Sequence, residues 1–292
     1  MYDGIVTPMI TPFNKKGEID YNATQILIED LKKFGVSGLF PMGSTGLFPF
    51  FKMNERKEFL KFVNEHSMGM TTFAGIGSSS TQEAIELSRY SSDMGIKVRV
   101  LMPTYYIKPD DEWMIKHFSD VISSSDSDIF IYNIPQLSGS NIDASIVSKL
   151  KNEFSQVKGI KDSSGDMRSF SKLIKFHSKE FSIFQGQDDL LLVSLSLGAD
   201  GGVCGTSNFS PSIVQLYKAY RDGNIEKARE IQVNVVNDLM YPVNAPNFPA
   251  GYYYAFYKKH NIEGGYRSPM LEPSAEKARL IDKALSDNSK QI

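Results

Sequence analysis

The centre of the chain reads Val157-Lys158-Gly159-Ile160-Lys161-Asp162-Ser163-Ser164-Gly165-Asp166. A mostly apolar run ends at Lys161 and gives way to small and polar residues that are typical of a tight turn. The residues beyond have helical character, so this segment predicts a β-strand that leads into an α-helix. Similar apolar runs recur about every 25 to 30 residues. We expect eight strands, at residues 5–10, 38–42, 71–76, 98–102, 129–132, 157–161, 182–185 and 201–204.

Longer amphipathic segments separate the expected strands, at residues 23–34, 55–64, 82–92, 111–123 and 142–151. Regular alternation of strand and helix predicts right-handed crossovers and a parallel sheet, and eight such units close into a barrel. The main alternative is an open, doubly wound sheet with a dinucleotide site. That fold needs Gly-x-Gly-x-x-Gly after the first strand, whereas this chain has Thr7-Pro8-Met9-Ile10-Thr11-Pro12. The sequence therefore favours an α/β fold of the (β/α)₈ type, a TIM barrel.

The alternation stops after residue 210. Helical segments follow at residues 211–220, 225–239, 250–259 and 274–285, and three prolines interrupt them within residues 241–249. We expect a barrel domain at residues 1–210 and a C-terminal helical extension at residues 211–292 that packs on the barrel. Asp188 is expected to cap the helix that follows the seventh strand.

Composition and charge exclude several classes of function. The 34 acidic and 32 basic residues are spread along the chain, so no basic patch suits nucleic acid or an anionic membrane. No apolar run approaches the roughly 20 residues of a membrane span, and the pattern of the first residues leads us to expect no secretion signal. Cys204 is the only cysteine, which favours a cytoplasmic protein without disulfides. The four histidines lack the spacing of a metal site, so we expect no metal.

Lys161 and Tyr132 end two neighbouring strands of the expected barrel, and active sites of such barrels lie at the C-terminal strand ends. A lysine is ordinarily a hydrated cation, but in a dry pocket it loses its charge and can attack a carbonyl carbon. A phenol a few ångströms away can move the protons that imine chemistry requires. The alternatives are a solvated lysine and a tyrosine that only fills the core.

Other strand ends carry further candidates. Gly43-Ser44-Thr45-Gly46 follows the second strand, where it forms either a plain turn or a nest of backbone N–H groups for a carboxylate. Tyr105 and Tyr106 lie on the loop after the fourth strand and can pack across an interface or present a phenol. We also expect the substrate to contact Pro8, Tyr105, Leu137, Gly186, Gln187 and Val203.

Four motifs, in this order and spacing, resemble the dihydrodipicolinate synthase and N-acetylneuraminate lyase superfamily: Gly43 to Gly46, Tyr105-Tyr106, Tyr132-Asn133-Ile134-Pro135 and Gly159 to Gly165. The resemblance spans nearly the whole chain and includes its opening and its close, Ile5-Val6-Thr7-Pro8 and Arg267-Ser268-Pro269. It implies a pyruvate-dependent class I aldolase that is a homotetramer built from dimers. No cofactor is implied beyond the covalent imine between lysine and substrate.

The same resemblance implies roles for individual residues. Lys161 forms the imine, and Tyr132 shuttles protons. Ser44 and Thr45 hold the pyruvate carboxylate, with Gly43 beside them and Thr45 also counted among the catalytic residues. Tyr106 reaches in from a partner subunit.

Two departures from the superfamily pattern narrow the choice of member. Dihydrodipicolinate synthases carry an arginine two residues after the Tyr-Asn-Val/Ile-Pro motif, where it binds the acid group of the second substrate. Leu137 stands at that position here. Leu47 follows Gly46 in place of the usual glutamate, which is similar to archaeal 2-keto-3-deoxygluconate aldolases.

The sequence therefore predicts reversible cleavage of 2-keto-3-deoxygluconate to pyruvate and glyceraldehyde. Two other interpretations stay open, an N-acetylneuraminate lyase or another pyruvate-dependent lyase, and a non-catalytic barrel that binds a keto acid. The sequence does not decide whether a galactonate-derived or a phosphorylated substrate is also accepted.

Overall fold

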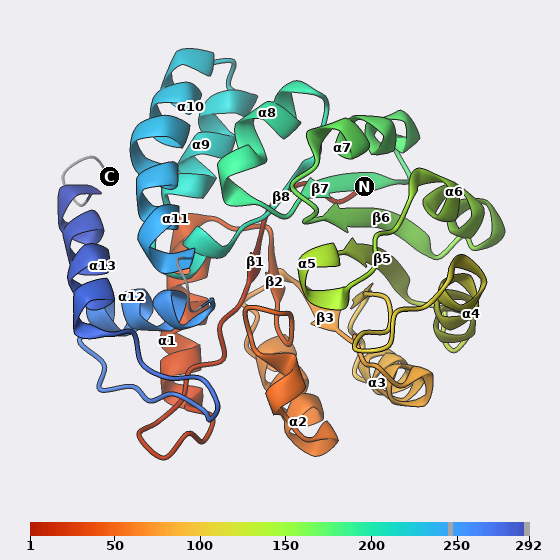
Figure 1. Ribbon diagram of the computed structural model, residues 1–292, viewed down its shortest axis with the longest axis horizontal. Helices are drawn as coiled ribbons and strands as arrows, with labels where there is room; N and C mark the ends of the chain where they lie inside the picture. The colour runs from red at the N-terminus through yellow and green to blue at the C-terminus, as the bar shows by residue number, and fades with distance from the viewer. Residues whose placement is uncertain (245–247, 289–292) are drawn as a thin grey trace.

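A computed structural model of the chain describes residues 1–244 and 248–288. Eight parallel strands close into a barrel in chain order, and β8 pairs with β1 (Figure 1). The expected barrel and its eight strands are confirmed, which excludes the open doubly wound sheet. The strands are β1 (Gly4–Pro8), β2 (Gly38–Phe40), β3 (Thr71–Gly75), β4 (Val98–Leu101), β5 (Asp128–Asn133), β6 (Val157–Asp162), β7 (Ser182–Gln185) and β8 (Gly201–Val203).

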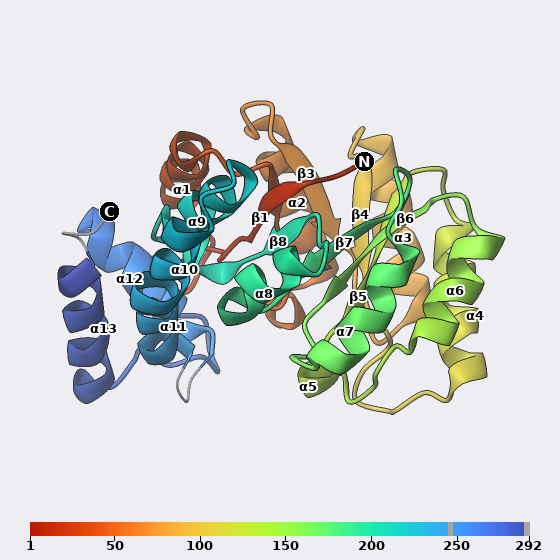
Figure 2. The same ribbon diagram turned by 90° about the horizontal axis from the view of Figure 1, so that it is seen from above.

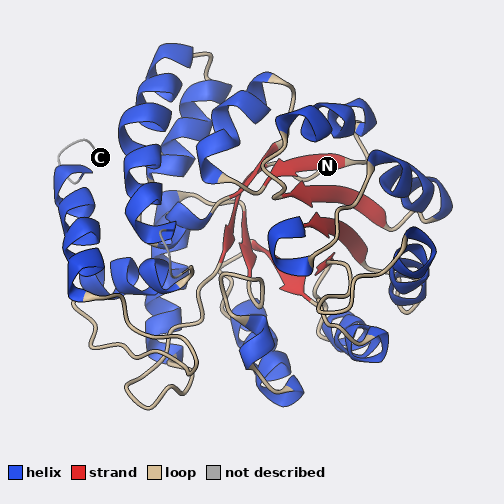
Figure 3. Cartoon of the chain, in the orientation of Figure 1, coloured by secondary structure: helices blue, strands red, loops and turns tan. Residues whose placement is uncertain are grey.

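Helices surround the strands, as Figure 3 shows. The five helices expected between strands are confirmed as α1 (Tyr21–Phe34), α2 (Met53–Glu65), α3 (Thr81–Asp93), α4 (Asp111–Ile122) and α6 (Ala144–Glu153). The helices expected, without bounds, after the sixth and seventh strands are present as α7 (Met167–Leu173) and α8 (Leu191–Ser196), whereas the sequence did not reveal α5 (Pro135–Ser138). These helices have four to seven residues, too few to display a helical period.

The C-terminal helices begin with α9 (Ser212–Arg221), which packs against β1. The others gather on one side of the barrel (Figure 2): α10 (Ile225–Ile231), a π-helical turn (Gln232–Val236), α11 (Asn237–Asn244), α12 (Ala250–His260) and α13 (Ala275–Asn288). None of the described helices is long and apolar enough to cross a bilayer.

One expectation for this region is wrong, because Pro242 lies inside α11 and does not interrupt the helix. A proline inside a helix removes one backbone hydrogen bond, but the helix continues past Pro242 to Asn244, the last residue described before residue 248. The middle of the expected proline-rich break, Ala245-Pro246-Asn247, lies outside the described residues.

Aromatic rings fill the barrel interior one layer below Tyr132 and Lys161. Phe130 lies 5.4 Å from Phe73 and 5.6 Å from Phe184, measured between ring centroids. A Cβ atom at Gly159 would come within 2.5 Å of the Phe130 ring, so this strand position has room only for glycine. Because side chains on a strand alternate between its faces, Tyr132 and Lys161 follow on the same inward face, one layer higher.

Candidate active site

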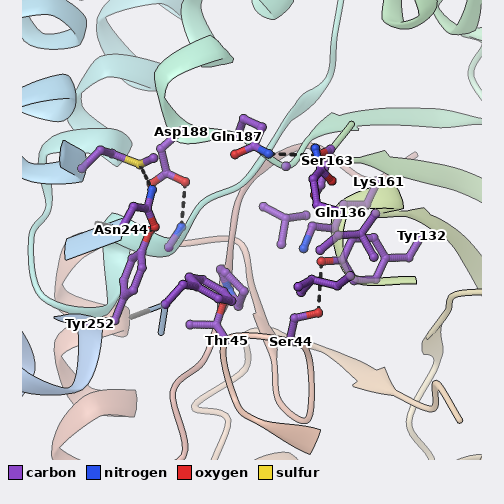
Figure 4. Close-up of a pocket in the computed structure, with 18 residues that line it drawn as sticks. Ser44, Thr45, Tyr132, Gln136, Lys161, Ser163, Gln187, Asp188, Asn244 and Tyr252 are labelled. Atoms are coloured by element: carbon purple, nitrogen blue, oxygen red, sulfur yellow. Dashed lines mark hydrogen bonds between the residues drawn. The ribbon is translucent and has the colours of Figure 1, made fainter. Parts of the chain in front are cut away.

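A cavity of about 290 Å³ opens at the C-terminal ends of the strands (Figure 4). Nine of the residues expected from sequence line it: Pro8, Ser44, Thr45, Tyr132, Leu137, Lys161, Gly186, Gln187 and Val203. The structure thus brings together residues from β1, β5, β6 and β8, from α5 and from the loops after β2 and β7. Three expected residues, Gly43, Tyr105 and Tyr106, do not line this cavity.

Lys161 and Tyr132 face each other directly across the β5–β6 pair. The Lys161 Nζ atom lies 3.9 Å from the centroid of the Tyr132 ring and 5.1 Å from that of Phe40. Both residues are only 4% exposed. No carboxylate within the described residues forms an ion pair with the Lys161 amine. The site therefore holds an amine in an aromatic, water-poor setting beside a phenol.

Residues next to this pair lock the two strands in register. Asn133 follows Tyr132 and donates its side-chain amide to Asp162, which follows Lys161, at 2.7 Å. Ser164 donates to the other carboxylate oxygen of Asp162, also at 2.7 Å. Burial raises the pKa of the Asp162 carboxyl, while these hydrogen bonds oppose the rise. The buried bridge fixes the spacing of the phenol and the amine on the opposite face.

Gly186 makes room for the lysine side chain. A Cβ atom there would collide with Ser163 Oγ and lie 3.0 Å from Lys161 Cε. Ser163, which the sequence did not single out, also lines the cavity, and its carbonyl accepts from the Gln187 side chain at 2.9 Å. The glycine turn after β7 therefore shapes the space around the amine.

Ser44 and Thr45 lie across the cavity from the lysine, on the loop after β2. The hydroxyl groups of Ser44 and Tyr132 lie 3.4 Å apart. A dashed line joins them in Figure 4. The backbone N–H groups of Ser44 and Thr45 donate to no group in the described parts of the chain. Two free N–H groups and two hydroxyls beside a buried amine suit the carboxylate of a 2-keto acid.

Gly43 has a structural place next to this loop. A Cβ atom at Gly43 would lie 2.9 Å from the ring of Phe40, so the glycine lets the loop pass over that ring. Phe40 in turn packs edge-on against Tyr132, with ring centroids 6.1 Å apart. Gly43 therefore shapes the cradle without lining the cavity.

The C-terminal extension supplies part of the wall that sequence reasoning missed. Met240, Asn244, Phe248 and Tyr252 line the cavity, and the Tyr252 hydroxyl donates to Asn244 at 2.9 Å. Their contact with the barrel depends on how helices distant in sequence pack. No local pattern in the sequence signals it.

Asp188 corrects an expectation, since its side chain does not cap the helix that follows β7. Its carboxylate is buried and accepts from the N–H groups of Gly205 and Thr206, at 2.9 and 2.8 Å, and from the Thr206 hydroxyl at 2.6 Å. Burial raises the pKa of this carboxyl. Asp188 lines the cavity and ties the loop after β7 to the loop after β8.

One known protein family matches almost the whole length of this chain. The model of the dihydrodipicolinate synthetase family matches residues 1–288. The chain belongs to the dihydrodipicolinate synthetase family. This membership confirms the resemblance seen in the sequence motifs and makes the chain an enzyme of the lyase class.

Several members of the dihydrodipicolinate synthetase family are close relatives. An uncharacterized DapA-like lyase of Thermoplasma acidophilum is 63% identical over 286 residues, 98% of each chain. The 2-dehydro-3-deoxy-D-gluconate/2-dehydro-3-deoxy-phosphogluconate aldolase of Picrophilus torridus is 52% identical, over 92% of this chain and all of that one. The solved 2-keto-3-deoxygluconate aldolase of Picrophilus torridus has a TM-score of 0.91 at 53% identity, and covers 94% of this chain and 99% of its own.

Another solved member of the dihydrodipicolinate synthetase family was determined with pyruvate. This protein, YagE of Escherichia coli, has a TM-score of 0.94 at 28% identity and covers 99% of each chain. Its structure is described as a complex with pyruvate. The barrel geometry of this chain is therefore that of a fold which holds a keto acid in another member.

Tyr105 and Tyr106 do not line the cavity of the present chain. Tyr105 packs edge-on against Phe48, with ring centroids 5.8 Å apart. Tyr106 is 97% exposed and has a φ of +77°, a conformation that costs a tyrosine free energy. Neither side chain contributes to the site of its own subunit in the described chain.

Cys204 and the histidines also lie outside the chemistry. Cys204 is fully buried, and burial raises the pKa of its thiol well above the ordinary value. Within residues 1–244 and 248–288, no group of three or more His, Cys, Asp and Glu side chains can hold a metal ion.

Proposed function

We propose that the chain is a class I aldolase that reversibly cleaves 2-keto-3-deoxygluconate to pyruvate and glyceraldehyde. The observation that carries the proposal is the buried amine of Lys161, 3.9 Å from the Tyr132 ring, in a cavity with the Ser44 and Thr45 loop. The named activity of the Picrophilus torridus relative, which is 52% identical, supports the choice of substrate.

The first half of the reaction builds the imine. The substrate carboxylate binds the hydroxyl and N–H groups of Ser44 and Thr45, which turns the C2 ketone toward Lys161. The unprotonated amine attacks C2 and forms a carbinolamine, which loses water to give a protonated imine. Holding both reactants in this geometry can lower the barrier by about 7 kcal/mol or more.

The second half breaks the bond between C3 and C4. Tyr132, now a phenolate because its proton left with the water of dehydration, takes the proton of the C4 hydroxyl, and the electrons of the C3–C4 bond move into the imine to give an enamine. Glyceraldehyde leaves, and C3 of the enamine takes a proton. Water then hydrolyses the imine, which releases pyruvate and the free Lys161 amine. The covalent imine serves as the electron sink, so the proposed reaction uses no cofactor.

Reduction with borohydride tests the imine directly. Incubation with pyruvate and borohydride should add a reduced pyruvate adduct to Lys161, located by mass spectrometry of peptides. Lys161→Ala should lose both the adduct and turnover while it keeps its fold. An adduct on another lysine refutes the assignment, and the absence of any adduct favours a non-catalytic barrel.

The substrate is tested with a panel of sugar acids scored for pyruvate release. Leu137 lines the cavity where an arginine binds a second acid group in dihydrodipicolinate synthases, and Lys161 is the only cationic side chain among the residues that line this cavity in the described chain. We expect faster turnover of 2-keto-3-deoxygluconate than of N-acetylneuraminate. Galactonate-derived and phosphorylated analogues complete the panel. Faster release from N-acetylneuraminate would overturn the choice of substrate.

The proposal includes a homotetramer built from dimers, in the cytoplasm. Tyr106 supports the shared interface, because an almost fully exposed aromatic ring on a strained backbone suits contact with a second subunit better than contact with water. Light scattering after size-exclusion chromatography measures the mass, and a mass of one 32.7 kDa chain would contradict the assembly.

A further inference from the structure

The first two peptide groups of the loop at residues 43–46 are held by the loop itself. The Gly43 carbonyl accepts from the N–H of Phe48 at 3.3 Å, and the Ser44 carbonyl accepts from the N–H of Leu47 at 3.0 Å. In a trans peptide the N–H points opposite to the carbonyl of the preceding residue. The N–H groups of Ser44 and Thr45 therefore point away from these partners and stay free for a ligand.

The next two carbonyls of the loop are held by residues from elsewhere in the chain. Tyr253 on α12 donates its hydroxyl to the Thr45 carbonyl at 3.2 Å. Thr11, in the segment after β1, donates its hydroxyl to the Gly46 carbonyl at 2.9 Å. The Tyr253 hydroxyl also accepts from the backbone N–H of Thr11 at 3.1 Å, so the two side chains form one network.

Tyr253 is itself held in place. It is fully buried and stacks on Phe13, with ring centroids 5.7 Å apart and an angle of 2° between the rings. Burial also raises the pKa of its hydroxyl, which keeps the proton needed for donation to Thr45. A packed ring allows the hydroxyl to occupy only one place, so its hydrogen bond fixes the position of the peptide that it contacts.

We propose that Tyr253, together with Thr11, is a positioning residue for the carboxylate of the substrate. The two hydroxyls hold the last two peptide groups of the loop at residues 43–46, so that the N–H groups of Ser44 and Thr45 face the cavity before the keto acid binds. The inference rests on the proposed function, since it takes the carboxylate of a 2-keto acid as the ligand of this loop. Through this link the C-terminal extension preorganises a site in the barrel.

Removal of one oxygen tests the proposal. Tyr253→Phe keeps the stacked ring and loses the hydroxyl. We expect the pyruvate concentration for half-maximal borohydride trapping to rise about five- to tenfold, the range for one lost hydrogen bond. Trapping with methyl pyruvate, a neutral ester with the same ketone, should change by less than twofold. The KM for the sugar acid should rise more than kcat falls.

The matched control is Tyr257→Phe on the same helix. The Tyr257 hydroxyl accepts from the N–H of Phe13 at 2.8 Å and donates to the carbonyls of Phe13 and Gly265. It is thus also buried and hydrogen-bonded to the backbone, but none of these bonds involves the loop at residues 43–46. This variant should lose similar stability in thermal unfolding, yet retain the preference of the wild type for pyruvate over methyl pyruvate.

The outcomes separate this inference from the proposed function. If the wild type forms no pyruvate adduct, the proposed function fails. If the wild type forms the adduct and Tyr253→Phe keeps the full preference for pyruvate over its ester, the positioning role alone is overturned. Thr11→Val, which removes only the bond to Gly46, provides a second test if Tyr253→Phe does not fold, and it should shift the same preference in the same direction.

Discussion

At the scale of single residues, the phenol of Tyr132 is the group whose removal separates imine formation from bond cleavage. Its hydroxyl lies 3.4 Å from Ser44 Oγ, and its ring contacts the Lys161 amine. Tyr132→Phe should still be trapped with pyruvate, because the amine and the carboxylate cradle remain and water can supply the proton that dehydration needs. Turnover of the sugar acid should fall about a hundredfold or more, the general effect of losing an acid–base group. Steady-state kinetics of pyruvate release measure this, and unchanged turnover would remove Tyr132 from the mechanism.

Gly186 allows a second residue-scale prediction about the space around the amine. Gly186→Ala places a methyl group against Ser163 Oγ and 3.0 Å from Lys161 Cε. The side chain of Lys161 must shift, so we expect the rate of pyruvate trapping to fall about tenfold or more, since small displacements of reacting groups carry large costs. Ser163→Ala combined with Gly186→Ala removes the closer collision and should recover part of the rate. Equal rates for the single variant and the wild type would show that the lysine needs no such space.

Residues differ in how far their role can be read from the sequence. Lys161 and Tyr132 were predictable because both end apolar strands, and the strand ends of a barrel converge. Asp188 misled the prediction, since an aspartate after a strand is ordinarily a cap, and here it binds N–H groups of the next loop instead. The sequence did not indicate that Tyr252 and Tyr253 lie near the site, because such contacts join distant parts of the chain. The hydrogen bond between Tyr253 and Thr45, for example, spans more than 200 residues of sequence.

At the scale of secondary structure elements, the packing of α4 on α3 contains a buried histidine. His117 on α4 is hydrogen-bonded through Nδ1 to the Thr81 hydroxyl at 2.9 Å and is 1% exposed. Burial lowers the pKa of His117 from 6.5 to about 4. Its folded pKa is thus lower than its unfolded pKa, so the stabilising effect is complete above pH 6.5 and is lost as the pH falls toward 4.

A pH series tests this linkage between helix packing and protonation. Between pH 7.5 and pH 5, His117 should account for a loss of about 2 kcal/mol in the free energy of unfolding. His117→Asn retains a hydrogen-bond partner for Thr81 and removes the titrating group. The variant should therefore lose about 2 kcal/mol less in the free energy of unfolding over this pH interval than the wild type does. Urea denaturation at each pH measures the free energy of unfolding of both proteins. Because only the change in this free energy with pH is compared, the cost of the substitution at neutral pH cancels. Parallel profiles would contradict the prediction.

Elements were predictable to the extent that their pattern is local. The eight strands followed from short apolar runs, and the long helices between them from their period. The short helix α5 was not predicted, and α7 and α8 were predicted without bounds, because four to seven residues carry no period. Pro242 was placed in a break because prolines usually end helices, whereas α11 contains it near its last turn. Packing of the C-terminal helices over the barrel mouth depends on the whole fold.

At the scale of the whole molecule, the proposed assembly completes each site with a tyrosine from the next subunit. Tyr106 is 97% exposed and lies outside the cavity of its own chain. If the phenol acts across the interface, Tyr106→Phe should lower kcat while the subunit keeps its fold. Every subunit contains both the predicted barrel domain, residues 1–210, and the predicted extension, residues 211–292. In the proposed tetramer, the Tyr106 phenol can therefore enter a site only from another subunit.

Mixed tetramers test whether Tyr106 acts in the neighbouring site. Lys161→Ala and Tyr106→Phe subunits are produced together with different tags, and the hybrids are purified through both tags. A site with an intact Lys161 can then receive an intact Tyr106 from its partner, so hybrids should turn over substrate faster than either parent. Hybrids of Lys161→Ala with Tyr132→Phe are the control. These two residues line the cavity of one chain, from neighbouring strands, so mixing cannot restore a complete site. Recovery in both hybrids, or in neither, would rule out a tyrosine shared across the interface.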